Sequence, residues 1–453
     1  MRDKSVPAKD SQRKQPPARK RPASAGPTAS AEVAIGKIAP ARLAAFEILT
    51  LVGEGKGHSD ELLHSPRMEP LSSEDRNLAT ALVMGVLRWQ IALDARVRGL
   101  LQRPEQRLAE PVSVALRLGA FQLLHLDRIP AYAALGESVE LCRVAGQPHA
   151  TGMVNAVLRK LAAAQKPGQR VFESVAAFSE RLGHPQWLVE RWAAAYGRET
   201  ALKICEADQK EPADTILFAE NGGDLPQMDD GSRLVAELAA AAMPSAKTVW
   251  DCCAAPGGKT LILAYRLESA EIAATDISTK RLAQTEARFR RYSYAERIHC
   301  AVADAAEVGD EKFDLILCDV PCSGTGTLAG NPEIRHRLKP EEFARQATRQ
   351  RAILSAALKR LGPGGRLVYS TCSLEPEECE RVVEDVIGTA GVNKIPVEGL
   401  LAGLAESGVL RKDVDLASSV REGALRTLPG VQSCDGFFAV VLEQSESTSK
   451  NPA

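Results

Sequence analysis

Two cysteines that follow apolar runs are the first residues of this sequence that could do chemistry. Cys372 lies in the stretch YSTCSLEPEE, and Cys322 lies in the stretch DVPCSGTGT. Free cysteine is among the most buried residue types, so each thiol is a core residue unless its surroundings indicate another role. The other roles are a metal ligand, half of a disulfide, or a nucleophile, which acts as the thiolate.

The cysteines of the chain form neither a disulfide framework nor a metal-binding pattern. The ten are Cys142, Cys205, Cys252, Cys253, Cys300, Cys318, Cys322, Cys372, Cys379 and Cys434. No CxxC pair occurs and no histidine pair stands nearby at zinc spacing, so we expect no metal site. The N-terminus lacks the apolar core of a secretory signal, and we expect a reducing, cytoplasmic compartment.

Both cysteines belong to a set of polar residues at the ends of short apolar runs after Ser245. The runs are TVWDCCAA, EIAATDIS, RIHCAVADA, FDLILCDVP and RLVYSTCS. Helical segments alternate with most of them, which predicts an α/β domain with a mostly parallel sheet and helices on both faces. Ligands of such sheets bind outside the carboxyl ends of the strands. The residues at those ends are Asp251, Asp276, Asp304, Asp319, Cys322 and Cys372. Packing alone does not require five polar strand ends, so we infer a site.

The loop DCCAAPGGKT after the first run indicates the kind of ligand. A Walker loop has glycine five positions before its Gly-Lys pair, but Cys253 stands there, so the phosphate-loop match fails. The stretch GTGTLA from Gly324 fits a dinucleotide fingerprint, but Pro332 follows where the helix should run. The loop does offer a glycine turn that a ligand can approach. A carboxylate at Asp276 suits a ribose diol and one at Asp304 an adenine amino group, as in S-adenosylmethionine.

Three of these motifs also carry a resemblance to a known family. DCCAAPGGKT, DVPCSGTGT and STCSLEPEE, in this order and spacing, resemble the motifs of RNA (cytosine-5) methyltransferases of the RsmB/Nop/Sun family. ARLAAFEILTLV, EDRNLATALVMGVLRW and GMVNAVLRKL are similar to the NusB-like N-terminal domain of the RsmB (Sun/Fmu) branch. The ending LPGVQSCDGFFAVVLE is similar as well, so the resemblance covers about residues 41–443.

The resemblance implies a role for each motif residue. Cys372 would be the nucleophile, Cys322 would assist product release, and Asp319 would lie between cofactor and base. Asp276 would bind the ribose of S-adenosylmethionine and Asp304 its adenine region. The loop for its methionine part would comprise Cys253, Ala254, Ala255, Pro256, Gly257, Gly258 and Lys259. Without the resemblance, Cys322 and Cys372 are equal candidates for the nucleophile.

The residues after Cys372 exert two opposite influences on its thiol. We predict that Pro376 is the first residue of a helix, whose positive end would stabilise a nearby thiolate. Glu375, Glu377 and Glu378 carry negative charges that oppose a thiolate. The balance depends on where the three carboxylates point.

The activity that the resemblance implies is transfer of a methyl group to carbon 5 of cytosine in RNA, with small-subunit ribosomal RNA as the expected substrate. Two alternatives stay open: methylation of tRNA or another RNA, and a non-catalytic RNA-binding factor of ribosome assembly. GNPEIRHRLKPEEFARQATRQR, directly after DVPCSGTGT, indicates either a basic lip beside the pocket or a solvated amphipathic helix. Its basic residues are Arg335, His336, Arg337, Lys339, Arg345, Arg349 and Arg351.

The elements that must position these residues divide the chain into five expected segments. These are a disordered basic tail over 1–35, a NusB-like all-helical domain over 36–165, a helical linker with a shortened pre-methyltransferase region over 166–243, a Rossmann-like S-adenosylmethionine-dependent methyltransferase domain over 244–443, and a disordered tail over 444–453. Helical periodicity dominates before the linker ends, and strand–helix alternation follows it.

The composition is that of an ordinary globular protein, with 45% hydrophobic and 25% charged residues and a net charge of −1. No run approaches the roughly 18 apolar residues of a membrane span. Residues 1–30 contain eight basic and two acidic side chains, so this stretch carries +6 and could touch nucleic acid weakly. We expect a cytoplasmic monomer that binds RNA and no membrane.

Overall fold

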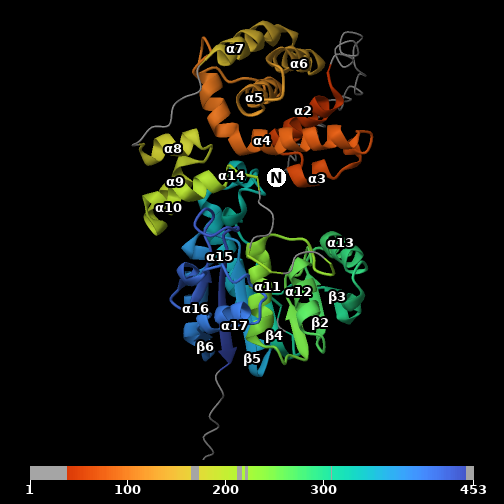
Figure 1. The fold of residues 1–453 in the computed structure, drawn as a ribbon, viewed down its shortest axis with the longest axis vertical. Coiled ribbons are helices and arrows are strands. Elements are labelled where there is room, and N and C mark those ends of the chain that lie inside the picture. Colours follow the sequence, from red (N-terminus) through yellow and green to blue (C-terminus); the bar gives the residue numbers. More distant parts are fainter. Residues whose placement is uncertain (1–37, 165–172, 212–216, 220–222, 308, 445–453) are drawn as a thin grey trace, which may run out of the picture.

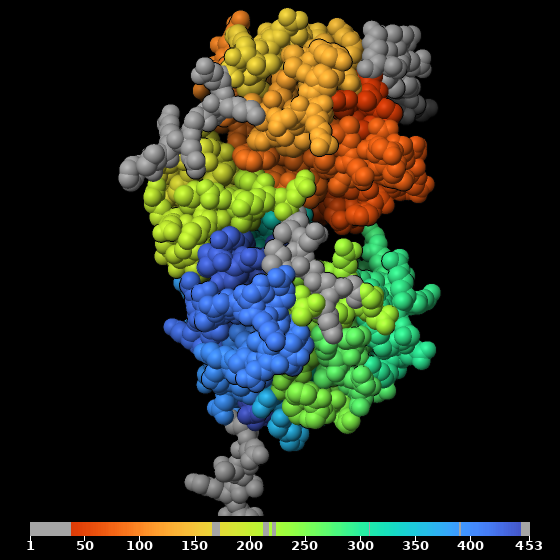
Figure 2. All heavy atoms as spheres, in the orientation of Figure 1, coloured from red at the N-terminus to blue at the C-terminus, as the bar shows by residue number. Residues whose placement is uncertain are grey.

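The computed structural model describes residues 38–164, 173–211, 217–219, 223–307 and 309–444. The predicted basic tail lies outside these residues, and so does the C-terminal tail apart from Gln444. Figure 1 shows a helical lobe with the N-terminal elements and a second lobe built on a sheet, stacked along the long axis of the molecule. Figure 2 shows that the two lobes and the helices between them are in contact along this axis.

The helical lobe is built from amphipathic helices around one apolar core. Among the described residues its α-helices are α2 (Pro40–Gly53), α3 (Ser59–Leu63), α4 (Ser73–Arg98), α5 (Glu110–His125), α6 (Ala131–Val144) and α7 (Thr151–Ala163). Helix α4 begins after the N-cap Ser72, whose hydroxyl accepts a hydrogen bond from the backbone N–H of Asp75. The predicted all-helical first domain is confirmed.

By length and composition alone, α4 is the one helix of the described chain that could cross a membrane. Charged residues interrupt the apolar sequence of this helix. Leu82, Val86 and Leu93 of this helix are buried in the core of the lobe, where α4 packs against α2 and α5. The apolar face of α4 is therefore already covered by protein.

Three short helices lie between the lobes in Figure 1: α8 (Val175–Arg181), α9 (Gln186–Tyr196) and α10 (Arg198–Ala207). Helix α9 ends at Gly197, whose φ of +85° disfavours other residues. The helices share an apolar cluster around Phe178 and Trp192, and Leu374 of the sheet lobe is part of that cluster. This linker is therefore packed onto the sheet lobe.

The second lobe contains the predicted parallel sheet. Its strands are β1 (Thr248–Asp251), β2 (Glu271–Asp276), β3 (Ile298–Val302), β4 (Phe313–Asp319), β5 (Leu361–Thr371), β6 (Val392–Ile395), β7 (Val420–Arg421), β8 (Ala424–Arg426) and β9 (Phe438–Gln444). The order is β3-β2-β1-β4-β5-β9-β8-β7, with β6 also paired to β9. The first five strands are mutually parallel and β9 runs antiparallel to β5. The Rossmann-like fold is confirmed.

Helices cover both faces of this sheet, as predicted. They are α11 (Asp230–Ala242), α12 (Gly258–Arg266), α13 (Thr279–Phe289), α15 (Pro340–Lys359), α16 (Glu380–Ala390) and α17 (Glu398–Glu406). The short helix α14 (Ile334–Arg337) lies instead at the junction between the lobes (Figure 1). Successive residues of β4 alternate between the faces: Leu315 and Leu317 belong to one apolar cluster, and Ile316 belongs to another. Helices α11, α12 and α17 pack together, and α15 packs against α16.

Part of the predicted basic lip faces inward and joins the two lobes. Arg335 is only 2% exposed, and its guanidinium donates to the backbone carbonyls of Arg88 and Gly183 at 3.1 and 3.2 Å. The His336 ring lies 2.6 Å from the carbonyl of Leu87, and burial lowers the pKa of His336 to about 4. The expectation of surface cations is wrong for these two residues, because buried carbonyls at the lobe junction need donors.

Candidate active site

Most of the predicted site residues meet in one cavity at the carboxyl ends of β1 to β5. Those in its wall are Cys253, Ala255, Asp276, Asp304, Asp319, Cys322 and Cys372. Strands β4 and β5 are parallel neighbours with Asp319 beside Ser370, so the loops that follow them lie together. That pairing brings Cys322 and Cys372, which are 50 residues apart in the chain, to the same point.

The other residues of the predicted cofactor loop support the cavity without lining it. The N–H of Ala254 donates to the carbonyl of Thr275 at 2.8 Å, which fixes the loop to β2. Gly257 precedes α12 with a φ of +90°, and a Cβ there would lie 2.5 Å from Cε1 of Phe289. Only glycine fits such a position. Pro256 and Gly258 complete the turn, and Gly258 begins α12.

Lys259 acts on the site through Asp319. Its ammonium Nζ lies 2.7 Å from Asp319 Oδ2, and the Ser370 hydroxyl donates to Oδ1 at 2.8 Å. Burial by itself lowers the pKa of Lys259, but the Asp319 carboxylate raises it, and the net pKa lies above its usual value. Lys259 is therefore charged at neutral pH. Sequence reasoning missed Ser370. This residue is identified by its pairing with Asp319 across strands β4 and β5.

The two carboxylates expected to hold a nucleoside are each fixed by backbone. Asp276 Oδ1 accepts from the N–H of Ser278 at 2.8 Å, and Asp304 Oδ1 accepts from the N–H of Ala306 at 2.9 Å. Ile277 also lines the cavity and is 53% exposed, which is unusual for a large apolar residue. Sequence reasoning missed this residue, although its place directly after Asp276 was a signal.

Cys322 and Cys372 are in direct contact. Their Sγ atoms are 3.3 Å apart, and both side chains are half-buried. The hydrogen bond to Cys372, followed by burial, raises the pKa of Cys322 well above its usual value. Cys322 therefore keeps its proton at neutral pH, and either sulfur can donate in the contact between the two thiols.

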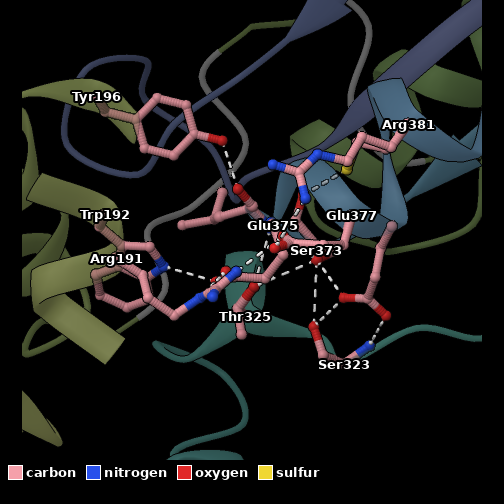
Figure 3. Close-up of polar contacts among 12 residues, drawn as sticks. Arg191, Trp192, Tyr196, Ser323, Thr325, Ser373, Glu375, Glu377 and Arg381 are labelled. Carbon is pink, nitrogen blue, oxygen red and sulfur yellow. Dashed lines mark hydrogen bonds and ion pairs between the residues drawn. The ribbon is translucent and has the colours of Figure 1, made fainter. Parts of the chain in front are cut away.

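The first two glutamates after Cys372 point into the linker. Figure 3 shows Arg191 and Trp192 of α9 directed at Glu375. The Arg191 guanidinium donates to Glu375 and Glu377, at 2.8 Å each, and the Trp192 indole N–H donates to Glu375 at 3.0 Å. These carboxylates are compensated by α9, so they are not free charges beside the thiol.

The third glutamate, Glu378, folds back toward the loop after β4. It accepts from the backbone N–H of Ser323 at 2.9 Å and from the Ser373 hydroxyl at 2.5 Å (Figure 3), and burial raises its pKa. The helix predicted to start at Pro376 is present only as one 3₁₀ turn. Pro376–Glu378 form a 3₁₀ turn, η5, that returns Glu378 to these donors, and α16 begins only at Glu380.

Of the cations expected to form a basic lip, Arg349 lies in the wall of the cavity. Arg337 and Arg345 pair with glutamates of their own helices, and Arg351 pairs with Asp385. A second cavity of about 570 Å³ lies between the lobes and shares Cys322 with the first. Its opposite wall comes from α3 and α4, and Lys339 also lines it. The site therefore opens toward the helical lobe.

Family models match both lobes of the chain. Residues 240–443 match the model described as 16S rRNA methyltransferase RsmB/F, and residues 39–163 match that of the NusB family. The solved structure titled "Crystal Structure of PH0851" has a TM-score of 0.66 with this chain at 21% identity, and covers 90% of this chain and 99% of its own. That likeness concerns the fold.

Curated relatives match nearly the whole chain. The probable ribosomal RNA small subunit methyltransferase B of Bacillus subtilis (strain 168) is 31% identical, over 87% of this chain and 96% of its own length. The ribosomal RNA small subunit methyltransferase B of Xanthomonas campestris pv. campestris is 30% identical, over 91% and 99%. The sequence resemblance is confirmed: this chain belongs to the RsmB/F family of 16S rRNA methyltransferases and carries a NusB domain ahead of the methyltransferase domain.

Proposed function

We propose that this protein methylates carbon 5 of a cytosine in small-subunit rRNA through a covalent adduct between Cys372 and carbon 6 of the base. Membership of the family makes the chain an S-adenosylmethionine-dependent RNA methyltransferase. The position on the base is our inference. It is carried by the 3.3 Å contact between the Sγ atoms of Cys322 and Cys372 in the wall of the cavity.

Methylation of carbon 5 requires covalent help from a cysteine, because carbon 5 of cytosine is a poor nucleophile in an aromatic ring. Addition of the Cys372 thiolate to carbon 6 breaks the aromaticity and makes carbon 5 enamine-like, which is covalent catalysis. Cys322 favours this thiolate by donating its proton toward it. The charged Lys259 ammonium, held 2.7 Å from Asp319, is a donor whose proton can be drawn toward N3 of the base, which favours the addition.

The same groups serve the second half of the reaction. S-adenosylmethionine, when bound, supplies a methyl group on a positively charged sulfur. Once carbon 5 carries the methyl group, its proton must leave to a base, and a water molecule is the candidate because Cys322 keeps its own proton. Cys372 is then expelled as a thiolate, and the Cys322 S–H stabilises it as a leaving group.

The residues of the cavity fit S-adenosylmethionine. Asp276 and Asp304 each have one oxygen held by backbone, which orients the carboxylate for a ribose diol and an adenine amino group respectively. The exposed side chain of Ile277 offers an apolar surface to the flat ring between them. Of the predicted loop, Cys253 and Ala255 would border the methionine part.

The target base must leave its stack to reach Cys372, at a cost on the order of a few kcal/mol unless it lies in a loop. The cavity between the lobes shares Cys322 with the site, and Arg349 supplies positive charge at the catalytic cavity. Both features suit an RNA strand with an extruded base.

Bisulfite sequencing of RNA from a deletion strain tests the proposal. We expect one methylcytosine to disappear from small-subunit rRNA, to return with the wild-type gene, and to stay absent with Cys372→Ala. A loss in tRNA would establish the other substrate. No lost methylcytosine in any RNA would contradict the enzyme and favour a ribosome assembly factor.

A further inference from the structure

The loop that carries Cys372 is held by a helix that neither family model covers. Helix α9, Gln186–Tyr196, lies between the two matched ranges, 39–163 and 240–443. Figure 3 shows Arg191, Trp192 and Tyr196 of this helix directed at the residues that follow Ser373. The mechanism proposed above uses none of these three side chains.

One side of the loop is fixed by the sheet lobe. The carbonyl of Cys372 accepts from the N–H of Gly326 at 2.9 Å, and the N–H of Leu374 donates to the Thr325 hydroxyl oxygen at 2.9 Å. Gly326 has to be glycine, because a Cβ there would lie 2.2 Å from the carbonyl oxygen of Gly436. These contacts hold the loop against the residues that follow β4. They do not involve the side of the loop that faces α9.

Helix α9 closes that side of the loop. The Tyr196 hydroxyl donates to the carbonyl of Leu374. Both backbone polar groups of Leu374 are therefore bonded, the N–H to Thr325 of the sheet lobe and the carbonyl to Tyr196 of α9. Glu375, only 1% exposed, receives hydrogen bonds from Arg191 and Trp192. The carboxylate next to the nucleophile loop is therefore buried with its partners on a different part of the chain.

Burial makes this arrangement cooperative. A carboxylate is strongly disfavoured in a protein interior unless donors compensate it. Trp192 is 0% exposed, and its indole N–H donates to the Glu375 carboxylate. A displacement of α9 would therefore leave a buried donor and a buried carboxylate without this hydrogen bond. The position of Glu375, and of the loop that contains it, is thus coupled to the docking of α9.

We propose that α9 is a positioning element for the nucleophile: Arg191, Trp192 and Tyr196 hold residues 374–377 so that the Cys372 sulfur faces Cys322 and the target base. The inference rests on the role proposed for Cys372. Reaction rates depend steeply on such placement, since a displacement of about 1 Å can cost about 100-fold. A merely structural α9 would instead affect stability and leave turnover intact.

Two variants of α9 and one matched control separate these roles. Arg191→Gln removes the guanidinium from Glu375 and Glu377, and Tyr196→Phe removes only the hydroxyl that binds Leu374. The control is Arg181→Gln in α8, because Arg181 pairs with Glu173 at 2.7 Å and its side chain is 34% exposed, against 33% for Arg191. Glu173 lies in the linker and not in the Cys372 loop.

The measurement is steady-state methyl transfer from radiolabelled S-adenosylmethionine to 16S rRNA transcribed in vitro. We expect kcat to fall roughly 10- to 100-fold in Arg191→Gln and about 3- to 10-fold in Tyr196→Phe. KM for S-adenosylmethionine should stay within about twofold, because the cofactor residues lie on other loops. Arg191→Lys should recover part of the loss, and Arg181→Gln should turn over as the wild type does.

A kcat for Arg191→Gln and Tyr196→Phe equal to that of Arg181→Gln would overturn the inference, whatever happens to the melting temperature. If Arg191→Gln does not fold, Tyr196→Phe decides by the same criterion. The proposed function fails in a different way, through a wild type that transfers no methyl group or a Cys372→Ala variant that still does. In that case the positioning role falls with it.

Discussion

The molecule contains two pairs of cysteines with the same sulfur–sulfur separation and opposite surroundings. Cys252 and Cys318 have Sγ atoms 3.3 Å apart, as Cys322 and Cys372 do. The first pair lies in the core beside Trp250, with Cys318 0% exposed, and the second pair is half-buried in a cavity wall. Close approach of two thiols therefore does not identify a reactive site. Exposure distinguishes the second pair, because Cys322 and Cys372 are half-buried whereas Cys252 and Cys318 are buried.

The sharpest test of this difference is removal of the proposed nucleophile. Cys372→Ala should reduce methyl transfer by more than about 10³-fold, because no other group can add to carbon 6. Binding of S-adenosylhomocysteine, measured by calorimetry, should be unchanged, since Asp276 ends β2 and Asp304 follows β3, so neither belongs to the loop of Cys372. Residual activity above a tenth of the wild type would move the nucleophile to another residue.

Removal of its partner should give a smaller loss with a distinct signature. Cys322→Ala leaves Cys372 able to attack but removes the donor that stabilises it as a leaving group, so turnover should slow about 10- to 100-fold. A covalent protein–RNA adduct should accumulate on denaturing gels. The double variant Cys322→Ala/Cys372→Ala is the control and should show none. An adduct in Cys372→Ala alone would exchange the two roles.

Alkylation compares the pairs without any substitution. The thiolate is the reactive form of cysteine, and burial raises the pKa of Cys318, so this residue stays a thiol as the pH rises toward 9. Iodoacetamide at pH 7 should modify Cys372 at least about tenfold faster than Cys318, as measured by mass spectrometry of peptides. S-adenosylhomocysteine should slow only the reaction at Cys372. Equal rates of alkylation at Cys372 and Cys318 would show that the two pairs do not differ in reactivity.

The smallest effect is expected for substitution within the core pair. Cys318→Ala removes a buried sulfur and should lower the free energy of unfolding by about 1–2 kcal/mol, with kcat within about twofold of the wild type. Urea denaturation measures the first quantity and steady-state transfer the second. A large loss of kcat with normal stability would place Cys318 in the reaction.

Sequence alone predicted the features that depend on local pattern. The alternation of apolar runs with helices indicated the parallel sheet, and the polar residue after each run indicated where Asp276, Asp319 and Cys372 would meet. Local pattern does not encode contacts between distant segments. Arg191 and Glu375 are 184 residues apart, and nothing near either residue indicates the pair.

The composition of a segment also did not predict the direction in which its side chains point. Arg335 and Arg349 stand in the same basic stretch, yet Arg335 is buried between the lobes and Arg349 lines the cavity. The short strands β7 and β8 cover two and three residues and have no periodicity to detect. Strand β8 pairs with β9, and β7 pairs with β8, so this edge of the sheet forms only in the folded chain.

The position of β9 has a consequence for the order of events during translation. Phe438–Gln444 is the last described element, yet it pairs with β5 along residues 366–371, directly before Cys372. Until this segment leaves the ribosome, β5 has an open hydrogen-bonding edge. The nascent chain therefore carries Asp276, Asp304 and Asp319 well before β5, the strand that precedes Cys372, is paired along both of its edges. A strand near the end of the described chain therefore completes the sheet next to Cys372.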